Sequence, residues 1–85
     1  MPRTVFTPAY AILIAVLKET RLRAGVGQVE LAQRMGKAQS FVSRTETGER
    51  RIDVIEVYAI ARALGVDPLA VFREVLRRLP RDVAV

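Results

Sequence analysis

The sequence predicts an all-α domain of five helices with short connections, and three observations predict it. A capping side chain followed by proline, a common start of a helix, opens two segments, at Thr7-Pro8 and at Asp67-Pro68. Between them apolar residues recur at spacings of three and four, the period of an amphipathic helix, and glycines follow several of these stretches. No segment has the character of a strand. With 85 residues the chain has room for one core, so we expect residues 1–85 to form a single domain.

The first helix is expected to run from Pro8 to about Ala24, with Gly25 just beyond it. Its first half, Ala9 to Leu17, holds nine apolar residues without a charge. That is far fewer than the roughly 20 that span a bilayer, and no small-residue cleavage site follows, so we expect no membrane segment. A helix that is apolar all round is buried on more than one side. The preferred interpretation is that one side meets a second subunit; burial within the domain alone is the alternative.

The stretch from Gln28 to Gly48 reads as two short helices joined by a tight turn at Gly36. Gly27 stands at the N-cap of the first helix, and the second helix turns Val42 inward. The opposite face of the second helix collects amide, hydroxyl and guanidinium groups, which cannot build a core but do pair with base edges and phosphates. These residues are Gln39, Ser40, Ser43, Arg44 and Thr47. The stretch therefore predicts a helix-turn-helix that reads DNA, at about residues 28–47.

Two further helices complete the predicted domain. Asp53 and Glu56 form a capping-box-like start for a helix from about Val54 to Leu64. The core residues expected on it are Val54, Val57, Ile60, Ala61 and Leu64. The last helix extends to about Leu79, because Pro80 stops it. Its expected apolar stripe consists of Leu69, Phe72, Leu76 and Leu79, widened by Val71 and Val75.

Composition and charge limit the classes of function that the chain can have. The chain has neither cysteine nor histidine, which removes disulfides, most metal sites and the common nucleophile and general-base pairs, and there is no glycine-rich phosphate loop. We expect no enzyme, no metal, no cofactor and a cytoplasmic setting. The formal charge is +5, and residues 34–51 carry the densest excess, with five basic side chains against two acidic ones. A basic patch suits a polyanion such as DNA, and a merely solvated surface is the alternative.

An ordered set of motifs extends along the chain from the first helix to the fourth. It consists of Arg21, Gly25, Gln28-x-x-Leu31-Ala32, Gly36, Gln39-Ser40-x-Val42-Ser43, Glu46-x-Gly48 and Ile60-Ala61-x-Ala63-Leu64-Gly65. With this set the chain resembles the phage-repressor class of helix-turn-helix regulators, the Cro-like or XRE-type family, over roughly residues 17–72. The resemblance implies a five-helix, lambda-repressor-like domain, usually dimeric, that regulates transcription in bacteria or phages by binding partly palindromic operators. Three positions depart from the family pattern: Lys37 and Thr45 stand where apolar residues are usual, and Ala38 where a capping serine or threonine is common.

The predicted DNA contacts fall into two groups. The predicted base-reading residues are Gln39, Ser40, Ser43 and Arg44. Among them Arg44 is the strongest candidate for a base-specific contact, because a guanidinium group pairs with O6 and N7 of guanine. The predicted phosphate contacts are Gln28, Lys37, Arg50 and Arg51, with Gln28 assigned by resemblance and by its place at a helix N-terminus. A solvated surface side chain is the alternative for each.

The remaining predictions concern assembly. The resemblance implies an ion pair between Arg21 and Glu46 that joins the first and third helices. The candidates for dimer contacts lie on the first and last helices: Ile12, Ile14, Val71, Val75 and Leu79. We therefore predict a dimeric, sequence-specific regulator of transcription, a repressor that binds double-stranded DNA with its two reading helices about one helical turn apart. The alternative is an antitoxin-like or other interaction module whose main partner is another protein.

Overall fold

The computed structural model describes residues 7–85, and within this range it contains five helices and no strand. The all-α prediction is confirmed. The helices are α1 (Pro8–Arg23), α2 (Gln28–Met35), α3 (Gln39–Thr47), α4 (Val54–Leu64) and α5 (Pro68–Arg78).

Side chains at the helix starts explain where the helices begin. The hydroxyl of Thr7 accepts a hydrogen bond from the backbone N–H of Tyr10, at 3.2 Å, and Pro8 follows as the first residue of α1. At α4 the capping box is complete, because Asp53 accepts from the N–H of Glu56 at 2.8 Å while the Glu56 carboxylate accepts from the N–H of Asp53 at 3.0 Å. These contacts satisfy N–H groups that a helix leaves without a partner in its first turn.

The turn between α2 and α3 depends on Gly36. This glycine has φ of 68°, in the left-handed region, and nothing lies within 4 Å of where its Cβ would stand. Backbone strain, not lack of space, is therefore the reason for a glycine here. At the other end of the turn, Ala38 is the N-cap of α3 and has no side chain that could cap the helix.

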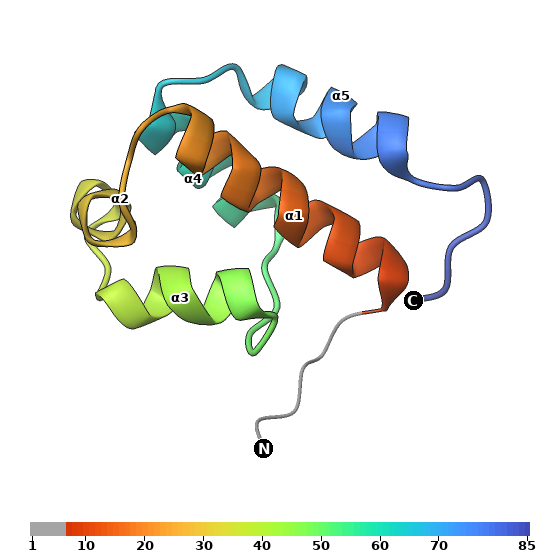
Figure 1. The fold of residues 1–85 in the computed structure, drawn as a ribbon, viewed down its shortest axis with the longest axis horizontal. Coiled ribbons are helices and arrows are strands. Elements are labelled where there is room, and N and C mark those ends of the chain that lie inside the picture. Colours follow the sequence, from red (N-terminus) through yellow and green to blue (C-terminus); the bar gives the residue numbers. More distant parts are fainter. Residues whose placement is uncertain (1–6) are drawn as a thin grey trace.

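Figure 1 shows α1 crossing the middle of the molecule, with α3 on one side of it, α5 on the other and α4 behind. Helix α1 packs against α3, α4 and α5, while α2 packs against α3 and α4. The core lies where these helices meet. It is built from Ile14, Val16, Leu17, Val26, Leu31, Ala32, Val42, Ile52, Val57, Ile60, Ala61, Leu64, Val71 and Val75.

One expectation about the core was wrong, and the predicted apolar stripe of α5 is only partly buried. Val54 is 70% exposed, because it is the first residue of α4 and lies beside the core contact, not within it. On α5 it is Val71 and Val75 that are buried, whereas the expected main stripe is largely uncovered: Leu69 is 66%, Phe72 48% and Leu76 54% exposed. The apolar arc of α5 is wider than the surface that the rest of the domain can cover, so spacing alone did not show which part faces inward.

Helix α1 is covered mainly by the domain itself. Ile14, Val16 and Leu17 are buried in the core, while Ile12 is half-buried. None of the helices in residues 7–85 is long and apolar enough to cross a membrane.

Candidate nucleic-acid interface

The predicted reading face lies along the outer side of α3. Gln39, Ser40 and Arg44 are exposed and Ser43 is half-buried, while Val42 and Thr45 of the same helix turn inward. In Figure 1 this helix lies at one edge of the molecule, on the side of α1 that is opposite α5. The four predicted base-reading residues therefore share one surface, and none of the other helices in residues 7–85 covers it.

A buried ion pair fixes α3 to α1. Nε of Arg21 lies 2.6 Å from Oε2 of Glu46, and Nη2 of Arg21 donates to Oε1 at 2.9 Å, which makes the contact bidentate. The side chains are 8% and 7% exposed. Nη1 of Arg21 also donates to the carbonyl of Val26, at 2.9 Å, in the loop before α2. One guanidinium thus joins α1, the following loop and α3.

The ion pair sets the charge state of both partners. Burial alone would raise the pKa of the Glu46 carboxyl, but hydrogen bonds from Arg21 and Gln28 outweigh burial, so this pKa lies below its usual value. The hydrogen bond to Glu46 raises the pKa of Arg21 above its usual range. Both groups are therefore charged at neutral pH, and each charge is neutralised by its partner.

Gln28 extends the ion pair to the surface. Its Nε2 donates to Oε1 of Glu46 at 3.0 Å, and its Oε1 accepts from Nε2 of Gln39 at 3.3 Å. A continuous chain of side-chain contacts therefore leads from the buried Arg21 to an exposed amide at the start of α3. Because Gln28 is also the first residue of α2, it stands where a helix presents free N–H groups to an anion.

Arg50 lies in the basic loop after α3 and is held by the protein itself. Its guanidinium donates to both carboxylate oxygens of Glu56, at 3.0 and 3.3 Å, and to Oγ1 of Thr45 at 3.4 Å. It also stacks on Phe41, with 4.4 Å from Cζ to the ring centroid. These contacts tie the loop to α3 and α4. They occupy the side chain that the sequence assigned to a phosphate.

The other predicted cations are placed differently. Lys37 lies over the ring of Phe41 at 5.5 Å, and neither it nor Arg44 forms an ion pair within residues 7–85. Arg51 lies over the ring of Tyr10, with 4.9 Å from Cζ to the centroid.

The sequence analysis assigned no role to Tyr10 and noted Thr45 only as a polar residue at a usually apolar position. The phenol oxygen of Tyr10 accepts from the N–H of Ile52 at 2.6 Å and donates to the carbonyl of Arg50 at 3.4 Å, so α1 holds the basic loop. Burial raises the pKa of Tyr10 above its usual value. Thr45 is buried and donates to the carbonyl of Phe41 at 2.7 Å, which explains how a polar residue is tolerated at a core position. A hydroxyl inside an otherwise apolar pattern was the available signal in both cases.

The predicted dimer contacts differ in how far the single chain buries them. Ile14, Val71 and Val75 are each about 5% exposed or less in the single chain. Side chains that already fill the core have little surface left to offer to a second subunit. Ile12 and Leu79 are half-buried.

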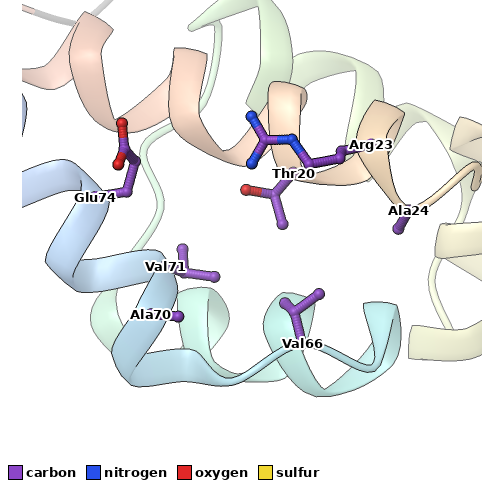
Figure 2. A pocket seen from close by; sticks show the side chains of 7 residues that line it. All are labelled: Thr20, Arg23, Ala24, Val66, Ala70, Val71 and Glu74. Carbon is purple, nitrogen blue, oxygen red and sulfur yellow. The ribbon is translucent and has the colours of Figure 1, made fainter.

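A hollow of about 310 Å³ lies between the end of α1 and the start of α5 (Figure 2). Figure 2 shows the side chain of Arg23 above Thr20, and the Glu74 carboxylate on the left, across the hollow from Ala24. That carboxylate is bound by Arg77 and Arg78, and these contacts lower its pKa to about 2. None of the predicted DNA-contacting residues lines the hollow, and no cluster of possible metal ligands occurs in the described part of the chain.

Comparison with known proteins shows which family has this fold. The family described as helix-turn-helix matches residues 17–71. An XRE-family-like protein from Pseudomonas syringae pv. tomato str. DC3000 is 46% identical, with a TM-score of 0.78 over 85% of this chain and 88% of that one. No curated protein sequence matches the chain.

Two more distant structures share the fold. The restriction-modification controller protein C.Esp1396I is 21% identical, with a TM-score of 0.77 over 85% of this chain and 94% of its own. The clp gene regulator ClgR from C. glutamicum is 22% identical, with a TM-score of 0.76 over 91% of this chain and all of its own. The resemblance predicted from the motifs is confirmed: the chain belongs to the XRE-type family of helix-turn-helix proteins, a family of DNA-binding transcriptional regulators.

Proposed function

We propose that the chain is a sequence-specific repressor that binds a partly palindromic operator as a homodimer. The observation that carries the proposal is the outer face of α3, where the amide of Gln39 and the guanidinium of Arg44 stand with two serines on a surface that no other described helix covers. An exposed helix face of this chemistry fits the major groove, where base edges present donors and acceptors. Two of the structural neighbours, by their names a controller protein and a gene regulator, support a regulatory role.

Each side chain has a defined task in this proposal. Arg44 makes the bidentate contact to O6 and N7 of a guanine, because it is exposed and has no ion-pair partner within the described residues. Gln39 presents its amide to a neighbouring base. Gln28, at the N-terminus of α2, binds a backbone phosphate together with the free N–H groups of the helix. Lys37 and Arg51 add phosphate contacts that position the domain.

The contact from Gln28 to Gln39 helps the reading face to act as one rigid unit. Since Glu46 accepts from Gln28 and Gln28 accepts from Gln39, the orientation of the surface amide depends on a charge held inside the protein. An amide that is oriented before binding loses less side-chain entropy on contact with a base. Ser40 and Ser43 lie beside it and reach the DNA only where the helix approaches closely.

Selection of binding sites from random duplex DNA tests the proposal. The expected result is a partly palindromic consensus containing a guanine in each half. With Arg44→Ala, discrimination for that guanine should fall by about 1–3 kcal/mol while other positions keep their preference. A uniform loss of affinity over all sequences would remove Arg44 from the base-reading role, and the absence of any consensus for the unaltered chain would overturn sequence-specific binding. For repression, a reporter whose promoter overlaps the selected site should be silenced; activation would contradict the assignment.

A further inference from the structure

Two cations share the ring of Phe41, a half-buried aromatic side chain on α3. Nζ of Lys37 lies 5.5 Å from the ring centroid, and Cζ of Arg50 lies 4.4 Å from it. Both distances fall within the range of about 6 Å over which an aromatic face attracts a cation. Lys37 comes from the turn before α3 and Arg50 from the loop after it. One ring therefore connects the basic residues at the two ends of the reading helix.

The ring is well placed to hold a side chain still. Phe41 packs against the core, and its backbone N–H donates to the carbonyl of Ala38 at 3.0 Å. The N–H of Lys37 donates to the carbonyl of Ala32 at 2.9 Å. The backbone is thus fixed at both residues, and only the side-chain torsions of Lys37 remain free. Contact with the ring restricts them.

The two cations differ in their other contacts. Arg50 donates to both carboxylate oxygens of Glu56 and to Oγ1 of Thr45. Lys37 is exposed and forms no ion pair within residues 7–85. Glu56 balances the charge of Arg50, so the surplus positive charge of the group belongs to Lys37. A cation without a carboxylate partner is the one that a phosphate can neutralise.

Glu56 also shows why the ring matters for Lys37. Hydrogen bonds from Arg50 are the main cause of the lowered pKa of the Glu56 carboxyl, and the charge of Lys37 adds to this lowering. Lys37 is therefore within electrostatic reach of Glu56, yet its ammonium lies over the ring of Phe41. Lysine has many rotamers to lose when it is ordered. A lysine that is already held in place loses fewer of them on binding.

We propose that Phe41 is a positioning residue for DNA binding: its ring holds the ammonium of Lys37 in place for a backbone phosphate, while Glu56 keeps Arg50 bound to the protein. This inference rests on the proposed function, because it concerns the phosphate contact assigned there to Lys37. It names the side chain through which that contact acts, and it explains why two cations on one ring have different roles. Phe41 itself contacts no DNA.

A double-mutant cycle between Lys37 and Phe41 tests the proposal, with the full chain binding a duplex of mixed sequence. Phosphate contacts carry no sequence information, so no operator is needed. Phe41→Leu should lower affinity about 2- to 10-fold when Lys37 is present, as expected when one long side chain loses its order. In the Lys37→Ala background the same change should have little further effect. An equal loss in both backgrounds would overturn the proposal, because a purely structural role of Phe41 does not depend on Lys37.

Two further variants make the cycle specific. Phe41→Tyr keeps an aromatic face for the cation, so it should bind DNA within about twofold of the wild type. Weak binding by Phe41→Tyr, with circular dichroism showing a folded chain, would overturn the role of the ring. Lys37→Ala should flatten the slope of log K against log salt by about 0.9. Arg62→Ala removes another cation that lines the same hollow as Lys37 and Phe41, and it should leave the slope unchanged.

Glu56→Gln tests why Arg50 does not act in the same way as Lys37. Glutamine keeps an oxygen for the N–H of Asp53, so the capping box is retained while the charge that holds Arg50 is lost. Arg50 should then add a phosphate contact and steepen the salt slope by up to about 0.9. Glu19→Gln is the matched control, because it removes a carboxylate partner of Arg78 on α5, across α1 from α3 (Figure 1). An unchanged slope in Glu56→Gln, or an equal change in Glu19→Gln, would overturn the assignment of the two cations.

Failure of this inference can be told apart from failure of the proposed function. If Lys37→Ala leaves the salt slope unchanged, the phosphate contact of the proposed function fails, and this inference fails with it. If Lys37→Ala flattens the slope but the cycle shows no coupling, the inference fails and the proposed function stands. If the cycle shows coupling but selection from random duplexes yields no consensus, sequence-specific reading fails and the positioning role of Phe41 stands.

Discussion

Nε2 of Gln28 donates to Oε1 of Glu46 at 3.0 Å, and this contact connects the interior of the domain to its reading face. On one side Glu46 is held by Arg21; on the other the oxygen of Gln28 accepts from Gln39. The buried ion pair therefore acts at two levels. It fixes α3 against α1, and it orients two amides that we propose contact DNA.

Removing the side chain of Arg21 should lower the free energy of unfolding substantially. In Arg21→Ala the Glu46 carboxylate stays almost fully buried without its cation, and breaking such a pair costs about 3–5 kcal/mol. That is a large part of the stability of a small domain. Urea unfolding followed by circular dichroism measures the loss.

The double variant Arg21→Met with Glu46→Met is the control for this prediction. It removes both charges and keeps apolar volume, so it should be much closer to the wild type in stability than either single substitution. It also removes the acceptor of Gln28, and base preference should weaken even where stability is kept. A loss below about 1 kcal/mol in Arg21→Ala would contradict the buried character of the pair.

Stability should fall in acid, beginning near pH 4.5. The carboxyl pKa values of Glu46, Glu56 and Glu74 lie below the usual 4.5 in the folded chain, that of Glu74 at about 2. Unfolding returns them to ordinary values, so the unfolded chain binds protons first as the pH falls. The stability that these groups contribute is thus complete above about pH 4.5 and is lost as the pH falls through their folded pKa values.

Unfolding midpoints measured at pH 7, 4 and 3 check the acid prediction. Among the three carboxyl groups Glu46 is the most buried, so the double variant Arg21→Met with Glu46→Met should show a shallower dependence than the wild type. A midpoint that rises on acidification would have the wrong sign for lowered carboxyl pKa values and would contradict the prediction.

Arg50 and Arg51 should differ in the salt dependence of DNA binding, although they are neighbours. Arg50 is bound to Glu56, Thr45 and Phe41, so Arg50→Ala should loosen the loop and lower affinity with little change in salt slope. If Arg51 binds a phosphate as proposed, Arg51→Ala should reduce the slope of log K against log salt by about 0.9. Arg62→Ala, an exposed arginine on α4, serves as the control and should change neither quantity. Equal slope changes for the two loop variants would return Arg50 to the phosphate contacts.

The sequence was sufficient to predict the helices because their signals are local. Caps such as Thr7 and Asp53, and a glycine such as Gly36, act within one turn, so the five helices were recognised almost to the residue. What the sequence did not show was which part of a wide apolar arc the core would cover. On α5 the stripe from Leu69 to Leu76 and the pair Val71 and Val75 are both helical in spacing, and only the position of α1 decides between them.

The candidate site, like the fold, could be predicted only where its features follow from local sequence. The outward position of Gln39 and Arg44 follows from the periodicity of α3 alone. The retention of Arg50 by Glu56 depends on how the loop folds back on α4, and the role of Tyr10 depends on a contact 42 residues away in the sequence. The Tyr10 contact joins distant segments, and the Arg50 contact depends on the conformation of an irregular loop. Neither kind of contact leaves a periodic signal, so these two positioning roles became visible only in the structure.

Helix α3 lacks a capping side chain, and Ala38 offers a way to separate stability from DNA binding. Ala38 has the extended backbone of an N-cap, and the structure shows no side-chain hydrogen bond to the first turn of α3. Ala38→Ser supplies an acceptor for that turn and should stabilise the domain by about 1 kcal/mol, with DNA affinity kept.

Ala38→Asp should stabilise the domain at least as much as Ala38→Ser, because a carboxylate also interacts favourably with the helix dipole. The same negative charge stands one residue before Gln39, on the side proposed to face phosphates, so Ala38→Asp should bind DNA more weakly than the wild type, and most clearly at low salt. Thermal unfolding and binding to the selected operator at two salt concentrations measure the two effects. If Ala38→Asp bound as tightly as Ala38→Ser at low salt, the start of α3 would lie away from the DNA backbone, and the proposed docking of the reading helix would have to change.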